Sequence, residues 1–316
     1  MTPPQSLYKY CAFNANSLRA ILRAQVFHAL PIHFNDPLDC SPSLELDVTA
    51  GQLETLLRTM MRNRGAAESA IQTEIDRIAY FATDHDGNQD PGAYDESFSY
   101  NLGEEIKRLL RQDLGLKGVL SLSENWNEPL MWSHYAAQHQ GICIEYQTTG
   151  FEVKRLKAVN YNASRSIRAH DLYLWKCRGD DRAESRVFET YFYAKAPQWT
   201  YEKEWRDISD TAGSNASHFD LTAIHFGMRT DYVWKWILAK ALHLDKHIAL
   251  YNVFADEKSF KLNRQEMDRD EIERRGIDKP AFRVFAEFLN VEAADVAVGQ
   301  ELLRALAVGS GDVTQR

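Results

Sequence analysis

One stretch of the sequence, residues 118–146, constrains the fold more than any other part. It contains two apolar runs, 118–123 and 142–146, which are typical of buried strands. Between them, Asn127 is expected to cap a short helix that has a proline in its first turn. That helix carries three polar-tipped rings within one turn: Trp132, His134 and Tyr135. So many such rings in one short helix favour a site over plain packing.

The rest of the chain has the same mixed character. Further strands are predicted at 7–10, 26–28, 156–161, 224–228, 248–254 and 259–262. Helices are predicted after a cap at Asn14 or Asn16 and over 231–244. We therefore predict an α+β protein with a mixed central β-sheet.

Two helical regions are predicted outside that sheet. Apolar residues recur at helical spacing across about 51–111, which indicates a helical insertion after the first strands. Residues 263–316 are charged at first and then have helical patterns over 280–289 and 291–308. We expect residues 1–262 to form a single α+β domain with this insertion. Residues 263–316 would form a helical C-terminal extension packed on it.

Composition and charge limit the classes of function. Hydrophobic residues make up 44% and charged residues 26%, which is ordinary for a globular domain. The formal net charge of -8 argues against broad electrostatic binding to nucleic acid or an anionic membrane, although a local basic groove is compatible with it. The first residues lack signal-peptide features, no run is apolar enough to span a bilayer, and the four cysteines form no CxxC pair. We therefore expect a soluble, cytoplasmic protein with no membrane partner.

The common nucleotide, hydrolase and metal motifs are missing. There is no GxGxxG after a strand, no GxxxxGK[ST], no GxSxG and no HExxH. His243 and His247 are four residues apart, but the helix that would align them is predicted to end between them, so no metal site is expected there. Better candidates are carboxylates in turns or at strand ends beside aromatic residues: Asp36, Asp39, Glu145, Glu202 and Glu204.

These carboxylates also have a purely structural interpretation. Asp36 and Asp39 would then cap turns, and Glu145 would pair with Arg206 or Lys9. Ion-pair networks of this kind commonly account for charged residues beside a core. This alternative therefore stands beside a catalytic one.

The aromatic run 197–206 is the second dense cluster of the chain. If it is a strand, Glu202, Glu204 and Arg206 share one face of it. Three charges among large aromatic residues are costly unless they are paired or used in chemistry. The run is therefore predicted to contribute to a site.

Several short motifs occur in order along the chain. They are Leu7-Tyr-Lys-Tyr, Phe34-Asn-Asp-Pro-Leu-Asp39, Leu122-Ser123, Met131-Trp-Ser-His-Tyr135, Gly141-Ile-Cys-Ile-Glu-Tyr146, and Lys195 through Tyr201-Glu-Lys-Glu-Trp-Arg206. Together they resemble the bacterial domain of unknown function 2971, over most of the chain from about residue 7 to about residue 262. The family name brings no established activity with it.

A second resemblance concerns the order of the elements. A Leu-Tyr strand, an Asn-capped helix, a second strand and a late Glu-x-Glu strand are similar to the ADP-ribosyltransferase fold. In that superfamily the first strand binds the nicotinamide end of NAD, a serine or tyrosine lines the pocket, and a late glutamate is catalytic. The resemblance therefore implies NAD as the substrate.

The same resemblance implies roles for individual residues. Tyr8 or Lys9 would lie on the NAD-binding strand, and Ser123 or Tyr135 would line the pocket. Apart from the resemblance, we expect Asn35 and Asp36 of the 35–36 turn to contribute to the same binding site. The catalytic residues would be Glu204 or Glu202, with His134 beside them. A carboxylate in this position stabilises the oxocarbenium-like charge that builds up when the nicotinamide–ribose bond breaks.

Three functional hypotheses follow. The leading one is an NAD-consuming, ADP-ribosyltransferase-like enzyme that acts as a toxin or anti-phage effector on a macromolecular acceptor. The second is a nuclease that acts on nucleic acid and holds Mg²⁺ with four carboxylates: Asp36, Asp39, Glu145 and Glu202. The third is a non-catalytic binding module whose recognition surface carries Trp132, His134 and Tyr135.

Overall fold

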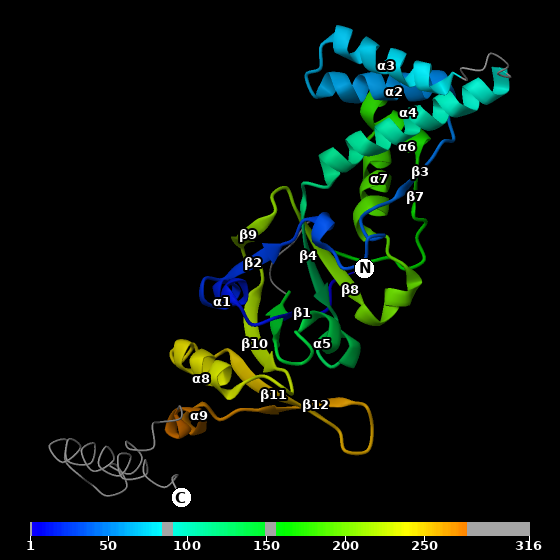
Figure 1. The fold of residues 1–316 in the computed structure, drawn as a ribbon. Helices are drawn as coiled ribbons and strands as arrows, with labels where there is room; N and C mark the ends of the chain where they lie inside the picture. Colours follow the sequence, from blue (N-terminus) through cyan, green and yellow to red (C-terminus); the bar gives the residue numbers. More distant parts are fainter. Residues whose placement is uncertain (1, 84–90, 149–155, 277–316) are drawn as a thin grey trace, which may run out of the picture.

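The computed structural model describes residues 2–83, 91–148 and 156–276 (Figure 1). Its helices are α1 (Ala15–Leu22), α2 (Ala50–Asn63), α3 (Glu68–Ala82), α4 (Pro91–Leu114), α5 (Pro129–Tyr135), α6 (Ala169–Arg178), α7 (Asp181–Tyr193), α8 (Tyr232–Ala241) and α9 (Arg269–Arg275). Its strands are β1 (Ser6–Cys11), β2 (Gln25–His28), β3 (Ser43–Glu45), β4 (Gly118–Ser123), β5 (Ile142–Gln147), β6 (Lys157–Ala158), β7 (Ser166–Arg168), β8 (Glu204–Ser209), β9 (Gly213–Ala216), β10 (Asp220–Phe226), β11 (Ala249–Ala255) and β12 (Leu262–Glu266). Two short 3₁₀ helices, η1 (Pro31–His33) and η2 (Pro197–Glu202), complete the described elements.

An eight-stranded sheet forms the centre of the molecule, in the order β12-β11-β10-β5-β1-β4-β8-β6. Strands β10 and β11 are parallel and are connected through α8, whereas the other neighbouring strands are antiparallel. The sheet is therefore mixed, and the predicted α+β class is confirmed. Strand β1 lies between β5 and β4, so that Tyr8 is paired with Glu145 on one side and with Ser123 on the other.

The two faces of this sheet differ in polarity, because successive side chains of a strand point in opposite directions. On one face, Leu7, Ile144 and Ile224 pack in an apolar core that includes residues of α1 and α8. On the other face, the cross-strand register aligns a polar row of Glu204, Ser123, Tyr8 and Glu145. The ring of His225, from β10, lies 3.1 Å from the Glu145 carboxylate on the same face. Functional side chains are therefore expected on this second face.

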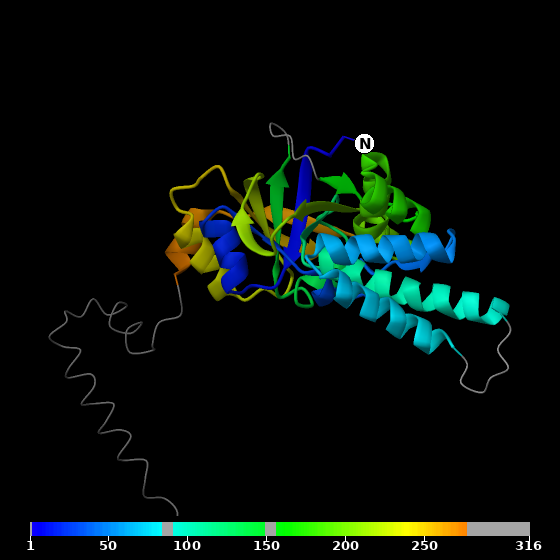
Figure 2. The ribbon, with the colours of Figure 1, turned by 90° about the horizontal axis from the view of Figure 1, so that it is seen from above.

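Helices α2, α3 and α4 form the predicted helical insertion and project away from the sheet (Figures 1 and 2). Helix α2 buries a stripe at helical spacing, made of Leu53, Leu56, Leu57 and Met60. The same apolar core contains Val119 of β4 and Ile208 of β8. The insertion is therefore packed onto the β4–β8 side of the sheet.

Three predicted boundaries in the strands and helices are wrong. The helix α5 is capped by Glu128, whose carboxylate accepts a hydrogen bond from the Leu130 amide, and not by Asn127. The strand predicted at 156–161 is reduced to two residues at the sheet edge. The last strand begins at Leu262 and not at residue 259, because Asp256 holds the preceding residues in a turn by accepting hydrogen bonds from the Lys258 amide and the Ser259 hydroxyl.

The C-terminal part of the described chain remains attached to the sheet. Strand β12 continues to Glu266, beyond the expected domain boundary at residue 262, and α9 follows it. The helices predicted at 280–289 and 291–308 lie outside the described residues. Of the helices that the structure describes, none has the length and apolar character needed to cross a membrane.

Candidate functional site

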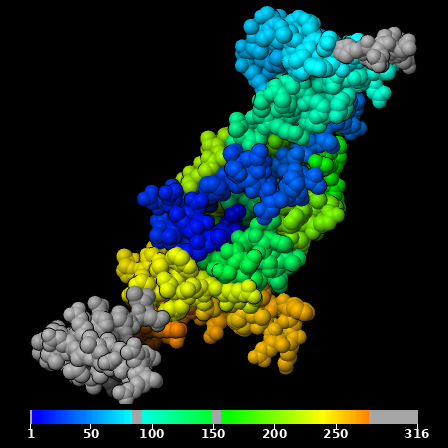
Figure 3. Space-filling view, viewed as in Figure 1, coloured from blue at the N-terminus to red at the C-terminus, as the bar shows by residue number. Residues whose placement is uncertain are grey.

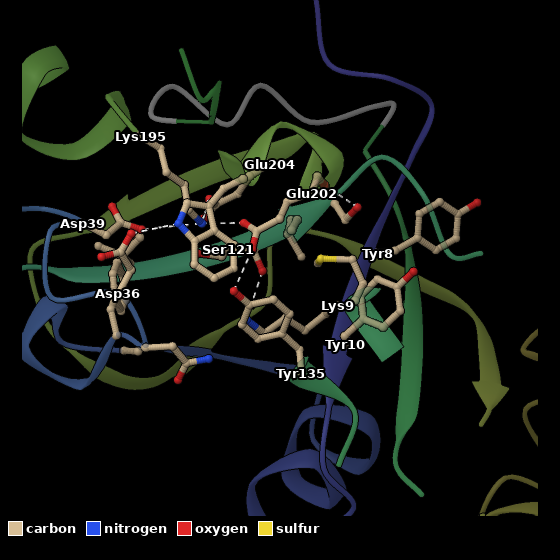
Figure 4. A pocket seen from close by; sticks show the side chains of 18 of the residues that line it. Tyr8, Lys9, Tyr10, Asp36, Asp39, Ser121, Tyr135, Lys195, Glu202 and Glu204 are labelled. Carbon is tan, nitrogen blue, oxygen red and sulfur yellow. Dashed lines mark hydrogen bonds and ion pairs between the residues drawn. The ribbon is translucent and has the colours of Figure 1, made fainter. Parts of the chain in front are cut away.

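A cavity of about 200 Å³ lies on the polar side of the sheet, beside β1, β4, α5 and η2. The surface is hollowed between the blue N-terminal segment and the green central segments (Figure 3). Eight of the nine predicted site residues line this cavity: Tyr8, Lys9, Asn35, Asp36, Ser123, Tyr135, Glu202 and Glu204. The structure therefore brings together residues that are far apart in the sequence (Figure 4).

The two glutamates reach the cavity from different elements. Residues Pro197–Glu202 form the 3₁₀ helix η2, and β8 begins only at Glu204, so the run 197–206 is not one strand and only Glu204 and Arg206 share a strand face. Lys203 joins the two elements with a positive φ of 43°, in the left-handed region. This turn directs the carboxylates of both Glu202 and Glu204 toward one amine, that of Lys195.

Lys195 is the central cation of the cavity. Its Nζ lies 2.8 Å from Oε2 of Glu204 and 3.6 Å from Oδ2 of Asp39, and it also contacts Oε2 of Glu202. Only 6% of the lysine side chain is exposed. Burial alone would lower the pKa of Lys195, but Glu204, Glu202 and Asp39 outweigh it and raise this pKa above its usual value. Lys195 is therefore charged at neutral pH.

Arg206 lies beneath the cavity and is fully buried. Its Nη1 and Nη2 donate to the two carboxylate oxygens of Asp39 at 2.9 and 2.6 Å. Its Nε and Nη2 donate to the two oxygens of Glu204 at 2.7 and 2.9 Å. The suggested pairing of Arg206 with Glu145 is therefore wrong, because both forks of the guanidinium are already occupied by these two carboxylates.

Glu204 is consequently held as an anion. Burial would raise its pKa, but the charges of Arg206 and Lys195 and the hydrogen bonds from both hold this pKa well below its usual range. Both of its oxygens are engaged by Arg206. Glu204 therefore fixes the position of the two cations and has little capacity left to exchange a proton.

Glu202 is in a different state. Tyr135 donates a hydrogen bond of 2.7 Å to its Oε1, and Lys195 contacts its Oε2. Burial raises the pKa of Glu202, and the nearby Glu204 charge adds to this effect, while Lys195 opposes it. A carboxyl group with a raised pKa in a cavity is suited to accept or release a proton. Glu202 is therefore the better acid–base candidate of the two.

The remaining predicted residues shape the cavity wall. The Ser123 hydroxyl donates a hydrogen bond of 2.7 Å to the backbone oxygen of Glu202 and so fixes the end of η2. The Asp36 carboxylate accepts a hydrogen bond of 2.8 Å from the indole N–H of Trp199. The Lys9 amine donates a hydrogen bond of 3.0 Å to the backbone oxygen of Ser121. Figure 4 places Tyr8 at the side of the cavity that is opposite to Asp39.

Two residues of α5 do not have the predicted placement. His134 is exposed and is not among the cavity-lining residues; its ring lies edge-on to Trp199, with 6.3 Å between the centroids. Trp132 is completely buried, and its indole N–H donates a hydrogen bond of 2.7 Å to the backbone oxygen of Trp126. A recognition surface that includes Trp132 is therefore wrong, because the α5 face that carries this ring points into the core.

The four carboxylates proposed for magnesium are not assembled either. Glu145 does not line the cavity; its Oε2 lies 3.1 Å from both His225 and Arg264. Asp39 and Glu202 are already neutralised by Arg206 and Lys195. Within residues 2–83, 91–148 and 156–276, no group of three or more His, Cys, Asp or Glu side chains is placed to hold a metal ion. The predicted four-carboxylate site is therefore not formed.

Lys195 and Trp199 also line the cavity, although neither is among the predicted site residues. A signal for Lys195 was present. Two buried carboxylates close in sequence, Glu202 and Glu204, require a nearby cation, and Lys195 precedes them by seven and nine residues. Trp199 follows from the same segment, because it is one turn before Glu202 in η2.

Part of this site lies in a segment of the chain that matches a known protein family. Residues 131–206 match the model of the family described as a protein of unknown function (DUF2971). The DUF2971 segment begins in α5 and ends in β8, and it contains four of the interacting residues: Tyr135, Lys195, Glu202 and Glu204. The predicted family resemblance is thus confirmed.

Comparison with curated proteins and with solved structures found no match. The similarity to the ADP-ribosyltransferase fold is not carried by the DUF2971 match and stays a prediction.

Proposed function

We propose that this chain is an NAD-consuming enzyme of the ADP-ribosyltransferase type, which breaks the nicotinamide–ribose bond in the cavity between β1, α5 and η2. The observation that carries the proposal is the state of Glu202. This carboxyl group faces the cavity, contacts Tyr135 and Lys195, and has a raised pKa. The predicted NAD-binding residues line the same space.

The size of the cavity supports the entry of one end of the substrate. About 200 Å³ is less than the 300–1,000 Å³ of typical ligand pockets, so a single ring with part of its ribose fits, but a whole dinucleotide does not. Aromatic side chains of Phe34, Tyr10 and Trp199 line it and offer apolar surface to a flat ring. The adenosine part would then lie outside the cavity.

The charge of the cavity supports the same chemistry. Four carboxylates and two lysines are among its lining residues. When the C–N bond breaks, nicotinamide leaves with the electron pair of the bond, and positive charge develops on the ribose. A carboxylate held close to the ribose lowers the energy of that state. Glu202 would then accept the proton of the attacking water or acceptor group as the new bond to the ribose forms.

A cellular role as a toxin or anti-phage effector is the finer part of this proposal. Expression of the wild-type chain in a bacterial host should deplete NAD and arrest growth, whereas Glu202→Gln should do neither. Glu189→Gln is the matched control, because Glu189 is an exposed glutamate that pairs with Lys157 on the surface. An unchanged NAD level in cells that contain folded wild-type protein would contradict the proposal.

A further inference from the structure

The two lysines of the cavity have opposite surroundings. Lys195 contacts three carboxylates. The Nζ of Lys9 donates one hydrogen bond, of 3.0 Å, to the backbone oxygen of Ser121. Among residues 2–83, 91–148 and 156–276, no carboxylate lies within ion-pair distance of Lys9. An ammonium group has three N–H donors, so Lys9 retains unused donors beside the cavity.

This placement follows from the geometry of β1. Strand β1 pairs with β4 at Tyr8 and Ser123, and the next side chain of β1, Lys9, extends across to Ser121 of β4. The amine is partly buried, and apolar side chains of Leu122, Val119 and Met131 line the same cavity. Lys9 is therefore shielded from bulk water and still faces a space that a small molecule can enter.

The surroundings also change the protonation of this amine. Burial lowers the pKa of Lys9, and the nearby titratable groups, Cys11, Glu204, Glu202 and Cys143, only partly oppose this effect. A larger share of Lys9 is thus the free amine at neutral pH than for a lysine on the surface. The free amine, unlike the ammonium, is a nucleophile.

We propose that Lys9 is a nucleophilic amine that forms an imine with a small aldehyde or ketone bound in the cavity. The nitrogen attacks the carbonyl carbon, the C=O bond breaks, and a C=N bond forms. Both hydrogens of the amine leave with the carbonyl oxygen as water, so no oxidant or reductant is required. Glu202, which lines the same cavity, is placed to transfer the proton that this dehydration needs. The cleavage of NAD does not use this step.

Reductive methylation of the full-length protein tests the proposal directly. Limiting formaldehyde with cyanoborohydride at pH 7 reduces each imine to a methylated lysine, and mass spectrometry of peptides gives the rate at each position. Lys9 should react about tenfold faster than the exposed Lys203 and Lys258, because a larger share of its amine is unprotonated. Lys195, in the same cavity but paired with carboxylates, should react more slowly than all three.

Two further measurements separate the cavity from other causes. In urea, the rate at Lys9 should fall to that of the exposed lysines; a Lys9 that stays fast in unfolded protein would show that the cavity is not responsible and would overturn the proposal. Glyoxylate with borohydride should add one adduct to the wild type and none at residue 9 of Lys9→Arg. A Lys9 that reacts no faster than Lys195 in the folded protein would also overturn it. None of these results depends on nicotinamide release.

Discussion

The hydroxyl of Tyr135 donates a hydrogen bond of 2.7 Å to Oε1 of Glu202, across 67 residues of sequence. The bond connects α5, at one wall of the cavity, to the end of η2 at the other. Burial and the Glu202 charge raise the pKa of Tyr135, so the hydroxyl stays protonated and remains a donor. This contact holds the carboxyl group of Glu202 in one orientation.

Tyr135→Phe removes that donor without removing the ring. We expect nicotinamide release to fall about tenfold, because one hydrogen bond to a charged group is worth roughly 1.5 kcal/mol. The free energy of unfolding should fall by about 1 kcal/mol. Chromatographic assay of nicotinamide and urea denaturation measure the two effects. The control is Tyr100→Phe, at an exposed position of α4, which should change neither. An unchanged release rate in Tyr135→Phe would show that this bond has no part in the reaction.

Arg206 is the main cation of the buried network beneath the cavity, so its loss should damage the fold. Arg206→Met leaves Asp39 and Glu204 with Lys195 as their remaining cation. Breaking a buried ion pair in this way costs about 3–5 kcal/mol of unfolding free energy. The matched control is Arg62→Met, because Arg62 and its partner Glu68 are both exposed; there we expect a loss of at most about 1 kcal/mol. Equal losses in the two variants, measured by urea denaturation, would contradict the importance of the buried network.

Stability should depend on pH through the two glutamates with opposite sign. The pKa of Glu204 is lower in the folded state than its ordinary 4.5, so its contribution is present above pH 4.5 and is lost as the pH falls through the folded value. The pKa of Glu202 is raised by burial, so its contribution is present below pH 4.5 and is lost as the pH rises through the folded value.

Midpoints of urea denaturation, measured at pH values below and above 4.5, separate the contributions of the two glutamates. Glu204→Gln should weaken the loss of stability on acidification. Glu202→Gln should reduce the loss of stability that occurs as the pH rises above 4.5. If the two variants have pH profiles that are parallel to the wild type, these carboxyl groups do not have the inferred pKa shifts.

Regular patterns in the sequence were sufficient for the fold class. The apolar runs of β4 and β5 and the helical stripe of α2 predicted their elements correctly, because the local apolar pattern reflects burial. The same reasoning failed for residues 197–206. Their aromatic and charged pattern suggested a strand, but Lys203 adopts a left-handed conformation that no local pattern indicates. The conformation is instead accompanied by tertiary contacts of the flanking glutamates with Lys195.

Most residues of the candidate site could be predicted from the sequence, but their individual charge states and orientations could not. The short motifs identified eight residues that line the cavity. The sequence could not show that Arg206 occupies both oxygens of Glu204 and leaves Glu202 as the group with the raised pKa, because that depends on which carboxylate lies nearest to the guanidinium. It also could not show that Trp132 points into the core while His134, two residues later, faces solvent.

The most direct test of the central claim is nicotinamide release from NAD by the purified protein. Wild-type protein should release nicotinamide, and Glu202→Gln should lower the rate by about 100-fold or more, which is the usual contribution of a general acid or base. Glu189→Gln should match the wild type, since its carboxylate pairs with Lys157 on the surface. Equal rates in wild type and Glu202→Gln, or no release by folded wild-type protein in the presence of candidate acceptors, would contradict the account.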